Sequence, residues 1–392
     1  MSDGPRSIPL SVPVLAGNEQ EYVRQCIDSG WVSSAGAFIT RFEDAVCELT
    51  GAAHAVACSS GTAALHVSLD MLGVRPGDAV IIPTVTFIAT ANAVRYCGAE
   101  PVLLGCDEYL NLDVAALEAY LGAHLDPATG VVTDPAGRTV RAIVPVHVYG
   151  TPCDMAAIAK IGARFGVPVV EDATESLGST YASGPLAGRH TGTIGTLGAF
   201  SFNGNKIITT GGGGMIVTDD DDLAERARYL TTQAKDDPLR YVHGAVGYNY
   251  RLTNVPAAIG VAQMEQLAGF IERKRENWTR YVEGLRDVRG LSFVDAPEWS
   301  APNRWFYGLV VEPAGYGLDR EQLMARLADA GVQSRPLWLP IHLQEPYRDC
   351  EVVGVERAVW YWERVLSLPC SSDLSPDDVD YVIETIRAGA RG

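Results

Sequence analysis

HAVACSSGTAALHVSLDML, residues 54–72, joins a short apolar run to a helical pattern through a Ser-Ser-Gly-Thr turn. The run HAVACS (54–59) predicts a β-strand, and GTAALHVSLDML (61–72) predicts a helix. A strand that passes directly into a helix is the repeating unit of a doubly wound fold, so this stretch favours an α/β protein. Its turn places Ser60, Gly61 and Thr62 at a helix start, where exposed amides and the helix dipole can hold a phosphate.

The same succession of strand and helix continues along the chain on both sides of this stretch. The strand runs are continuously apolar rather than alternating, which is typical of a mostly parallel sheet covered on both faces. Ligands of such sheets gather outside the carboxyl ends of the strands. The segments are AVIIP (79–83), AIVPVHVYG (142–150) before the helical MAAIAKIGARFG (155–166), VPVVEDA (167–173), GAFSFN (198–203) and GGMIVTDD (213–220).

The pattern changes toward the C-terminus. A long helical pattern runs from Pro256 to Tyr281, with Pro256 in a first helical turn. From about residue 285, short strand and helix signals predict a smaller α+β unit, closed by a helix that Ser375 caps. With 392 residues, the chain suits two domains. We expect an N-terminal arm (1–25), a large domain (26–265) and a small C-terminal domain (266–392).

Composition and charge narrow the class of function. The formal net charge of −17 argues against a nucleic-acid or anionic-membrane partner. The eight cysteines show no CxxC or His-spaced pairs, so neither a metal site nor a disulfide framework is indicated. The sequence has no secretory signal pattern and no apolar run of about 18 residues, which favours a cytoplasmic protein without a membrane segment.

Three features fall at predicted strand ends, and each has an ordinary explanation when taken alone. Ser60, Gly61 and Thr62 resemble a common helix cap. Asp172 lies at the end of the apolar strand VPVVED, where a carboxylate also serves as a helix cap or ion-pair partner. Lys206 follows the next strand in FNGNKIITTGGGG, and loop lysines are usually solvated surface charges. The lysine precedes the glycines, so this is no Walker loop; the glycines instead favour close approach of the backbone to a ligand or a neighbouring subunit.

Together the three features indicate pyridoxal 5′-phosphate (PLP). A lysine forms a Schiff base with the aldehyde, an acid keeps the pyridine nitrogen protonated, and helix-start amides hold the phosphate. Phe87, in PTVTF, is placed to stack on the ring, although core packing alone would also explain it. The chain has only four lysines, and the other three, Lys160, Lys235 and Lys274, lie in ordinary helical or charged contexts.

Several motifs carry a resemblance to a known family. The chain resembles bacterial nucleotide-sugar aminotransferases of the DegT/StrS type over about residues 8–386. The resemblance implies a fold-type-I PLP-dependent transferase, with a mostly parallel seven-stranded sheet between helices and a smaller α+β C-terminal domain. The motifs, in order, are SSGTAALH (59–66), PTVTFIATANAV (83–94), PVHVYGTPCDM (145–155), VVEDATESLGS (169–179), AFSFNGNKIITTGGGGMIVTDD (199–220) and GYNYRLTN (247–254).

The resemblance also implies residue roles. Lys206 matches the Schiff-base lysine, Asp172 the partner of the pyridine nitrogen, and Phe87 the ring-stacking position. Asn249 matches a phosphate contact that reaches over from the second subunit of a homodimer with shared active sites. The remaining matches are phosphate contacts at Gly61, Thr62 and Ser201, further cofactor contacts at Ser60, Glu175 and Asn203, and sugar-nucleotide contacts at Trp31, Ser33 and His342.

The expected reaction moves an amino group from L-glutamate to C4 of a nucleotide-linked 4-keto-6-deoxy sugar. GWVSS (30–34) and SRPLWLPIHLQEPY (334–347) resemble most the legionaminic acid and bacillosamine branch, whose substrate is UDP-4-keto-6-deoxy-N-acetylglucosamine. A GDP-4-keto-6-deoxymannose aminotransferase of the perosamine type, a PLP-dependent sugar dehydratase and a non-catalytic regulator are the alternatives. Pro256 and the longer loop 182–190 depart from the usual family pattern.

Overall fold

The computed structural model describes residues 6–237 and 239–390. Its centre is a sheet whose strands run in the order β1-β8-β7-β5 and β4-β2-β3. The two halves join where residue 143 bridges residue 169 and residue 146 bridges residue 172, both in parallel. The strands are β1 (His54–Cys58), β2 (Ala79–Pro83), β3 (Glu100–Leu104), β4 (Val140–Ile143), β5 (Val170–Asp172), β7 (Leu197–Ser201) and β8 (Gly214–Thr218).

This sheet is mostly parallel, as the strand and helix pattern predicts, and its seven strands match the arrangement that the family resemblance implies. Strand β8 runs antiparallel to both of its neighbours, β1 and β7, and the other pairs in the sheet are parallel. Beyond β3, the short strand β15 (Val352–Val353) adds a further parallel strand from the C-terminal region. The sequence did not predict that the C-terminal region would extend the central sheet.

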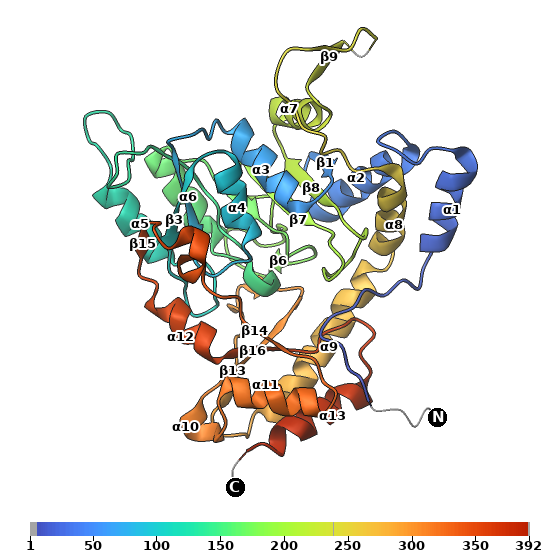
Figure 1. Cartoon of the computed structure of the whole chain (residues 1–392), viewed down its shortest axis with the longest axis vertical. Helices are drawn as coiled ribbons and strands as arrows, with labels where there is room; N and C mark the ends of the chain where they lie inside the picture. The colour runs from blue at the N-terminus through green and yellow to red at the C-terminus, as the bar shows by residue number, and fades with distance from the viewer. Residues whose placement is uncertain (1–5, 238, 391–392) are drawn as a thin grey trace.

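Helices cover both faces of the sheet (Figure 1). Helices α3, α4 and α7 pack on one face. Helices α2 and α8 cover the β1–β8–β7 part of the opposite face, and α5 and α6 cover its β2–β3–β4 part. The helices of this region are α1 (Glu19–Ser29), α2 (Ala37–Thr50), α3 (Gly61–Met71), α4 (Ala89–Tyr96), α5 (Val114–Ala123), α6 (Met155–Phe165), α7 (Asp221–Thr231) and α8 (Asn254–Met264).

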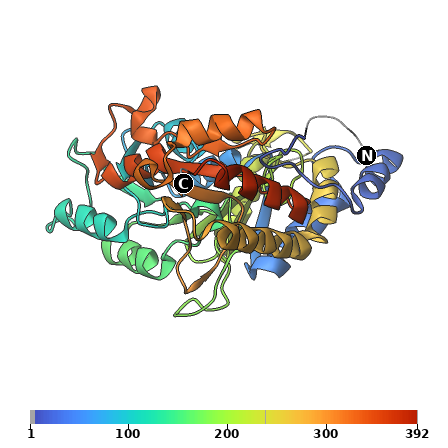
Figure 2. The ribbon, with the colours of Figure 1, turned by 90° about the horizontal axis from the view of Figure 1, so that it is seen from below.

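The C-terminal region forms a second, antiparallel sheet in the order β11-β13-β16-β14. Figure 1 shows it at the end of the molecule away from α7, and Figure 2 shows the helices α9, α11 and α13 of this region from below. Its elements are α9 (Leu267–Leu285), β11 (Leu291–Phe293), β13 (Tyr307–Val311), α10 (Pro313–Tyr316), α11 (Arg320–Asp329), β14 (Arg335–Pro336), α12 (Glu356–Arg364), β16 (Val365–Leu368) and α13 (Pro376–Arg387).

The prediction of one long helix from Pro256 to Tyr281 is wrong in one respect, because this stretch forms two helices. Helix α8 ends at Met264 and α9 begins at Leu267. Pro256 lies in the first turn of α8, where its missing amide hydrogen costs no intrahelical bond. The predicted cap of the last helix is confirmed, since the Ser375 side chain accepts a hydrogen bond from the Asp378 amide. The proposed domain limits at residues 25 and 265 stay a prediction.

Two short ribbons complete the fold. Strands β6 (Thr180–Tyr181) and β12 (Ser300–Ala301) pair beside the sheet, and the 182–190 segment returns from β6 so that His190 bridges Thr180. Strands β9 (Lys235–Asp237) and β10 (Val242–His243) belong to a loop that projects from the body beyond α7 (Figure 1).

Within the described residues, no helix is both long enough and apolar enough to span a membrane.

A buried carboxylate, Glu171, fixes the centre of the sheet. It lies on β5 and accepts hydrogen bonds from the backbone amides of Gly192 (2.8 Å), Ile194 and Gly195. His147 Nδ1 accepts from the Cys153 amide, so its Nε2 carries the hydrogen donated to Glu171 at 2.9 Å. Although burial alone would raise the pKa of Glu171, these donors hold it below its ordinary value.

Replacing Glu171 by glutamine should destabilise the fold. The NH₂ group of the glutamine side chain would face backbone amides that need a hydrogen-bond acceptor. We therefore expect the free energy of unfolding to fall by about 3 kcal/mol. Urea denaturation of the apo protein measures this change. The matched control is Glu118→Gln, which breaks an exposed pair with Arg164 and should change stability by less than about 1 kcal/mol. Equal effects of the two variants would contradict the assignment.

Candidate active site

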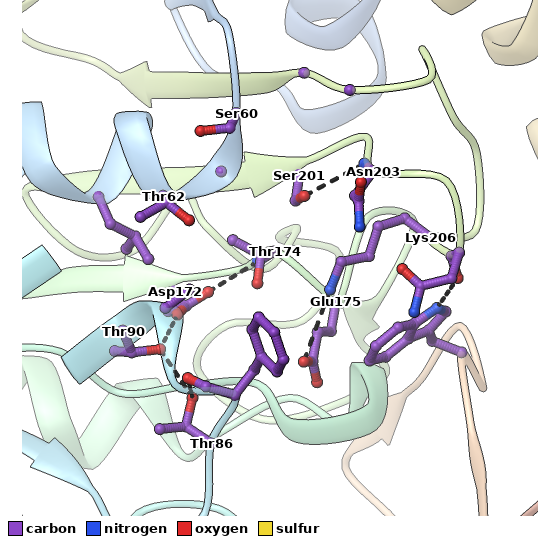
Figure 3. Close-up of a pocket in the computed structure, with 18 of the residues that line it drawn as sticks. Ser60, Thr62, Thr86, Thr90, Asp172, Thr174, Glu175, Ser201, Asn203 and Lys206 are labelled. Carbon is purple, nitrogen blue, oxygen red and sulfur yellow. Dashed lines mark hydrogen bonds and ion pairs between the residues drawn. The ribbon is translucent and has the colours of Figure 1, made fainter. Parts of the chain in front are cut away.

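A cavity of about 330 Å³ lies at the carboxyl ends of the central strands (Figure 3). The residues after β1, β2, β5 and β7 all reach it, so the topology brings together segments that are distant in sequence. The C-terminal region closes it with aromatic side chains. The lining comprises Ser60, Gly61, Thr62, Leu65, Thr86, Phe87, Ala89, Thr90, Asp172, Thr174, Glu175, Ser201, Asn203, Asn205, Lys206, Gly212, Gly213, Trp305, Phe306 and Trp338.

Asp172 ends β5 and is 2% exposed. Its carboxylate is held from two directions: the Thr90 hydroxyl donates to Oδ2 at 2.7 Å, and the Thr174 amide donates to Oδ1 at 3.2 Å. Thr90 in turn shares a hydrogen bond of 2.8 Å with Thr86. These contacts fix the carboxylate orientation at the floor of the cavity (Figure 3).

Lys206 extends into the cavity toward Glu175 (Figure 3). Its Nζ lies 3.8 Å from Glu175 Oε1, and the other carboxylate oxygen accepts the Tyr149 amide at 2.8 Å. Burial raises the pKa of Glu175 to about 7, against the opposing effect of the lysine charge. Burial also lowers the pKa of Lys206, while Glu175 and Asp172 oppose that shift. A lysine with a lowered pKa is suited to accept and return a proton.

Glycines shape the wall beside the start of α3. A Cβ on Gly61 would lie 2.8 Å from Ser201 Cβ and 3.1 Å from Thr174 Cγ2, so only glycine fits without displacement. A Cβ on Gly214 would collide with the Ser60 carbonyl. The close approach at Gly214 is therefore to the strand–helix turn of the same chain, and the approach to a ligand or a neighbouring subunit expected for the glycine run stays a prediction. The first amides of α3, which have no intrahelical acceptor, lie at this wall.

Comparison with known proteins identifies the family. The sequence profile of the DegT/DnrJ/EryC1/StrS aminotransferase family matches residues 13–387. The chain belongs to this family. It is 41% identical over 389 residues to GDP-perosamine synthase from Caulobacter vibrioides, with 98% of this chain and 99% of the relative covered. It is 37% identical over 380 residues to GDP-perosamine synthase from Escherichia coli O157:H7, with 97% of each covered.

The structural match covers the whole fold. A Streptococcus pneumoniae protein described as a sugar aminotransferase, solved in a PLP-form, matches with a TM-score of 0.86 and 25% identity over 98% of each chain. The protein is thus a PLP-dependent sugar aminotransferase with the fold-type-I architecture that the resemblance implied. The preferred UDP-linked substrate is not supported, because the curated relatives above are named for a GDP-linked sugar.

The residues at the cavity fit PLP. The cofactor requires a lysine, an acid for its ring nitrogen and an anion-binding helix start. Lys206 and Asp172 line the same cavity, and Gly61 and Thr62 at the start of α3 border it, where the missing Cβ of Gly61 lets Ser201 and Thr174 pack closely. Phe87 is 53% exposed and lines the cavity, so it is not the core residue that the alternative interpretation required.

The cavity brings together most of the predicted cofactor set but not the whole predicted site. Asn249 is exposed and bridges Thr232 beyond α7, outside the lining of its own chain. Trp31 is 60% exposed, and Ser33 lies in the same exposed segment. His342 is half-buried and its Nδ1 pairs with the Thr84 hydroxyl at 2.7 Å. Substrate contacts at Trp31, Ser33 and His342 stay predictions.

Several lining residues were missed by the sequence reasoning. Thr90 lies one helical turn after Phe87, and no local pattern distinguishes its hydroxyl from that of a surface threonine. Trp305, Phe306 and Trp338 come from the C-terminal region. From the sequence alone, aromatic residues there are most simply interpreted as part of the hydrophobic core. Asn303, fully buried, donates to the Glu175 carbonyl at 2.9 Å. Asn303 is not itself a lining residue, and the only sequence signal for it was an asparagine two positions before the adjacent aromatic residues Trp305 and Phe306.

The pH dependence of stability should report on Glu175. Because its pKa in the folded protein is about 7 and its ordinary value is 4.5, the folded state binds more protons between these values. Apo stability should therefore fall as pH rises from 4.5 to 7. Glu175→Gln removes this titration, so the decline should be shallower in that variant.

Apparent melting temperatures of the apo protein at pH 5, 6 and 7 measure this slope. The exposed Glu118→Gln variant should keep the slope of the parent protein. An unchanged slope in Glu175→Gln would show that the carboxyl group does not titrate in this range.

Proposed function

We propose that the protein transfers the amino group of L-glutamate to C4 of GDP-4-keto-6-deoxymannose, the perosamine-type reaction. The observation that carries this proposal is the 41% identity to a GDP-perosamine synthase over 98% of the chain. GDP-perosamine synthases from E. coli O157:H7 and Vibrio cholerae, at 37% and 34% identity, support it. The UDP-4-keto-6-deoxy-N-acetylglucosamine reaction becomes the alternative.

The proposed cofactor contacts use the wall beside α3. The amides of Gly61 and Thr62, with the Thr62 and Ser201 hydroxyls, would hold the phosphate at the helix N-terminus. Ser60 Oγ already accepts the Ala63 amide at 3.0 Å, so Ser60 contributes by shaping the turn. Phe87 would cover one face of the cofactor ring, and Asn203 would border it.

The proposed chemical roles fall to two residues. Bound PLP supplies an electron-withdrawing ring on which amino groups are exchanged between a donor and a keto acceptor. Asp172, held by Thr90 and Thr174, would keep a proton on the pyridine nitrogen. Lys206 would hold the cofactor covalently at rest and, once free, carry a proton to and from the reacting carbon. Its lowered pKa supports this role.

Two other functions on the same fold are less well supported. Sugar dehydratases that resemble this family carry histidine in place of the lysine, and Lys206 is present here. A non-catalytic regulator has no need for Lys206, Asp172 and Ser201 at one cavity. A complete absence of reaction with amino donors would be the signature of such a regulator.

The substrate proposal predicts an order of activity. With L-glutamate as donor, kcat/KM for GDP-4-keto-6-deoxymannose should exceed that for UDP-4-keto-6-deoxy-N-acetylglucosamine by at least about tenfold. Initial rates with both sugars measure the ratio. Lys206→Ala should lower both rates by about 10²- to 10⁴-fold. The reverse order would overturn the GDP proposal, and turnover retained by Lys206→Ala would overturn the catalytic assignment.

We further propose that the protein is a homodimer whose active sites are shared. Asn249 would reach the phosphate of the second subunit. The projecting loop that carries β9 and β10 exposes large apolar side chains, with Leu239 81%, Tyr241 75% and Val246 86% exposed. Clustered apolar exposure of this kind is typical of a surface that another chain covers.

Shared sites predict complementation between inactive subunits. Lys206→Ala and Asn249→Ala homodimers should both be impaired. In a mixed dimer, one site combines the intact Lys206 of one subunit with the intact Asn249 of the other. Co-refolded equal mixtures should therefore recover about a quarter of the activity of the parent protein. No recovery in mixtures shown to contain the heterodimer would contradict sharing.

A further inference from the structure

The amino group of Lys206 has a second neighbour besides Glu175. Its Nζ lies 4.0 Å from the centroid of the Trp305 ring, over the face of the indole. Glu175 Oε1 is the other flanking group, at 3.8 Å. The face of an indole carries negative potential and attracts cations within about 6 Å. The Lys206 ammonium thus lies between a carboxylate and a π face, with its side chain 13% exposed.

Trp305 is anchored at every polar atom. Its amide donates to Asn303 Oδ1 at 2.9 Å, and its carbonyl accepts from Lys274 Nζ at 3.1 Å. The indole Nε1 donates to the Asn205 carbonyl at 2.7 Å. The ring stacks on Phe306 at a centroid distance of 4.1 Å, and the residue is only 2% exposed. The backbone bonds fix the position of the residue, and the side chain cannot change rotamer without breaking the indole hydrogen bond and the stacking on Phe306.

The anchors of Trp305 are shared with the residues that it faces. Asn205, which accepts the indole hydrogen bond, directly precedes Lys206, so the ring is bound to the loop that carries the lysine. Asn303, which holds the Trp305 amide, also donates to the carbonyl of Glu175 at 2.9 Å. The two groups that flank the ammonium are therefore fixed relative to each other and to the lysine.

We infer that Trp305 is a positioning residue whose indole face holds the Lys206 ammonium whenever the lysine is not bonded to the cofactor. The lysine is free before the cofactor is loaded and again while an amino donor has displaced it. A freed lysine side chain has many rotamers, and a fixed π face restricts it to the one that returns the amine to the reacting atoms. This role is independent of which nucleotide sugar the enzyme uses.

Two physical effects of Trp305 have opposite signs, which makes the inference testable. The attraction to the π face favours the ammonium and raises the Lys206 pKa. The exclusion of water by the same ring favours the neutral amine and lowers it. The charged groups that face Lys206 are Glu175 and Asp172, and both remain in a Trp305 variant. The direction of the change therefore separates a cation-binding face from a simple lid.

The experiment titrates Lys206 directly in the apo protein. With only four lysines, protein labelled with ¹³C at lysine Cε gives four NMR signals. The signal of Lys206 is the one missing from apo Lys206→Ala. In Trp305→Leu we expect its pKa to fall by about one pH unit. Trp305→Phe, which keeps a π face, should restore most of the value.

The matched control is Trp338→Leu. Trp338 lines the same cavity and its ring lies 6.3 Å from that of Trp305, so its loss admits water without removing the π face under Lys206. We expect no downward shift in this variant. A rise or no change of the Lys206 pKa in Trp305→Leu, or an equal fall in Trp338→Leu, would overturn the inference.

A second measurement covers the case in which Trp305→Leu does not fold. Incorporation of 5,7-difluorotryptophan weakens the negative face of the indole while keeping its shape. The Lys206 pKa should fall in the fluorinated parent protein and stay constant when Trp305→Phe is fluorinated. An unchanged pKa in the fluorinated parent protein would equally overturn the inference.

Discussion

The site depends on keeping one lysine amine in a cavity where its side chain is only 13% exposed. Burial disfavours the charged form of Lys206, and a lone ammonium there would be costly. Glu175 and Asp172 offset this cost, yet Glu175 is itself buried and its pKa rises to about 7. The charged form of Lys206 or of Glu175 would be unfavourable in this buried environment without the other. The carboxyl group of Glu175 therefore titrates near neutral pH, beside an amine whose pKa burial lowers, and this combination suits proton exchange at the lysine.

The backbone at Tyr149 also helps to hold Glu175 beside Lys206. Tyr149 adopts a left-handed conformation with φ 56°, which is unfavourable for a side chain of its size. In this conformation its amide points at Glu175 Oε2, and its hydroxyl pairs with Ser367 of β16 at 2.9 Å. The next residue, Gly150, has φ 83° and lies against Asn303, where a Cβ would collide. Strain of this kind persists when the surrounding contacts determine it completely.

Sequence reasoning located the parts of the site that follow directly from strand order. Asp172 and Lys206 could be found because each follows an apolar strand, and parallel strands of one sheet end at one edge. Trp305 and Asn303 could not be found in this way, because the C-terminal region reaches the cavity only through tertiary packing. The break between α8 and α9 was missed for a related reason: apolar spacing continues through residues 265–266 and gives no stop signal.

Strand β15 has a mechanical consequence. The chain leaves the central sheet through α9, builds the C-terminal sheet, and then returns at β15 to pair with β3 before β16 completes the C-terminal sheet. That sheet is therefore joined to the central region through α9, through the pairing of β15 with β3 and through the pairing of β12 with β6. Backbone pairing at β15 and at β12 thus holds the aromatic wall of Trp305 and Trp338 against the cavity that Asp172 lines.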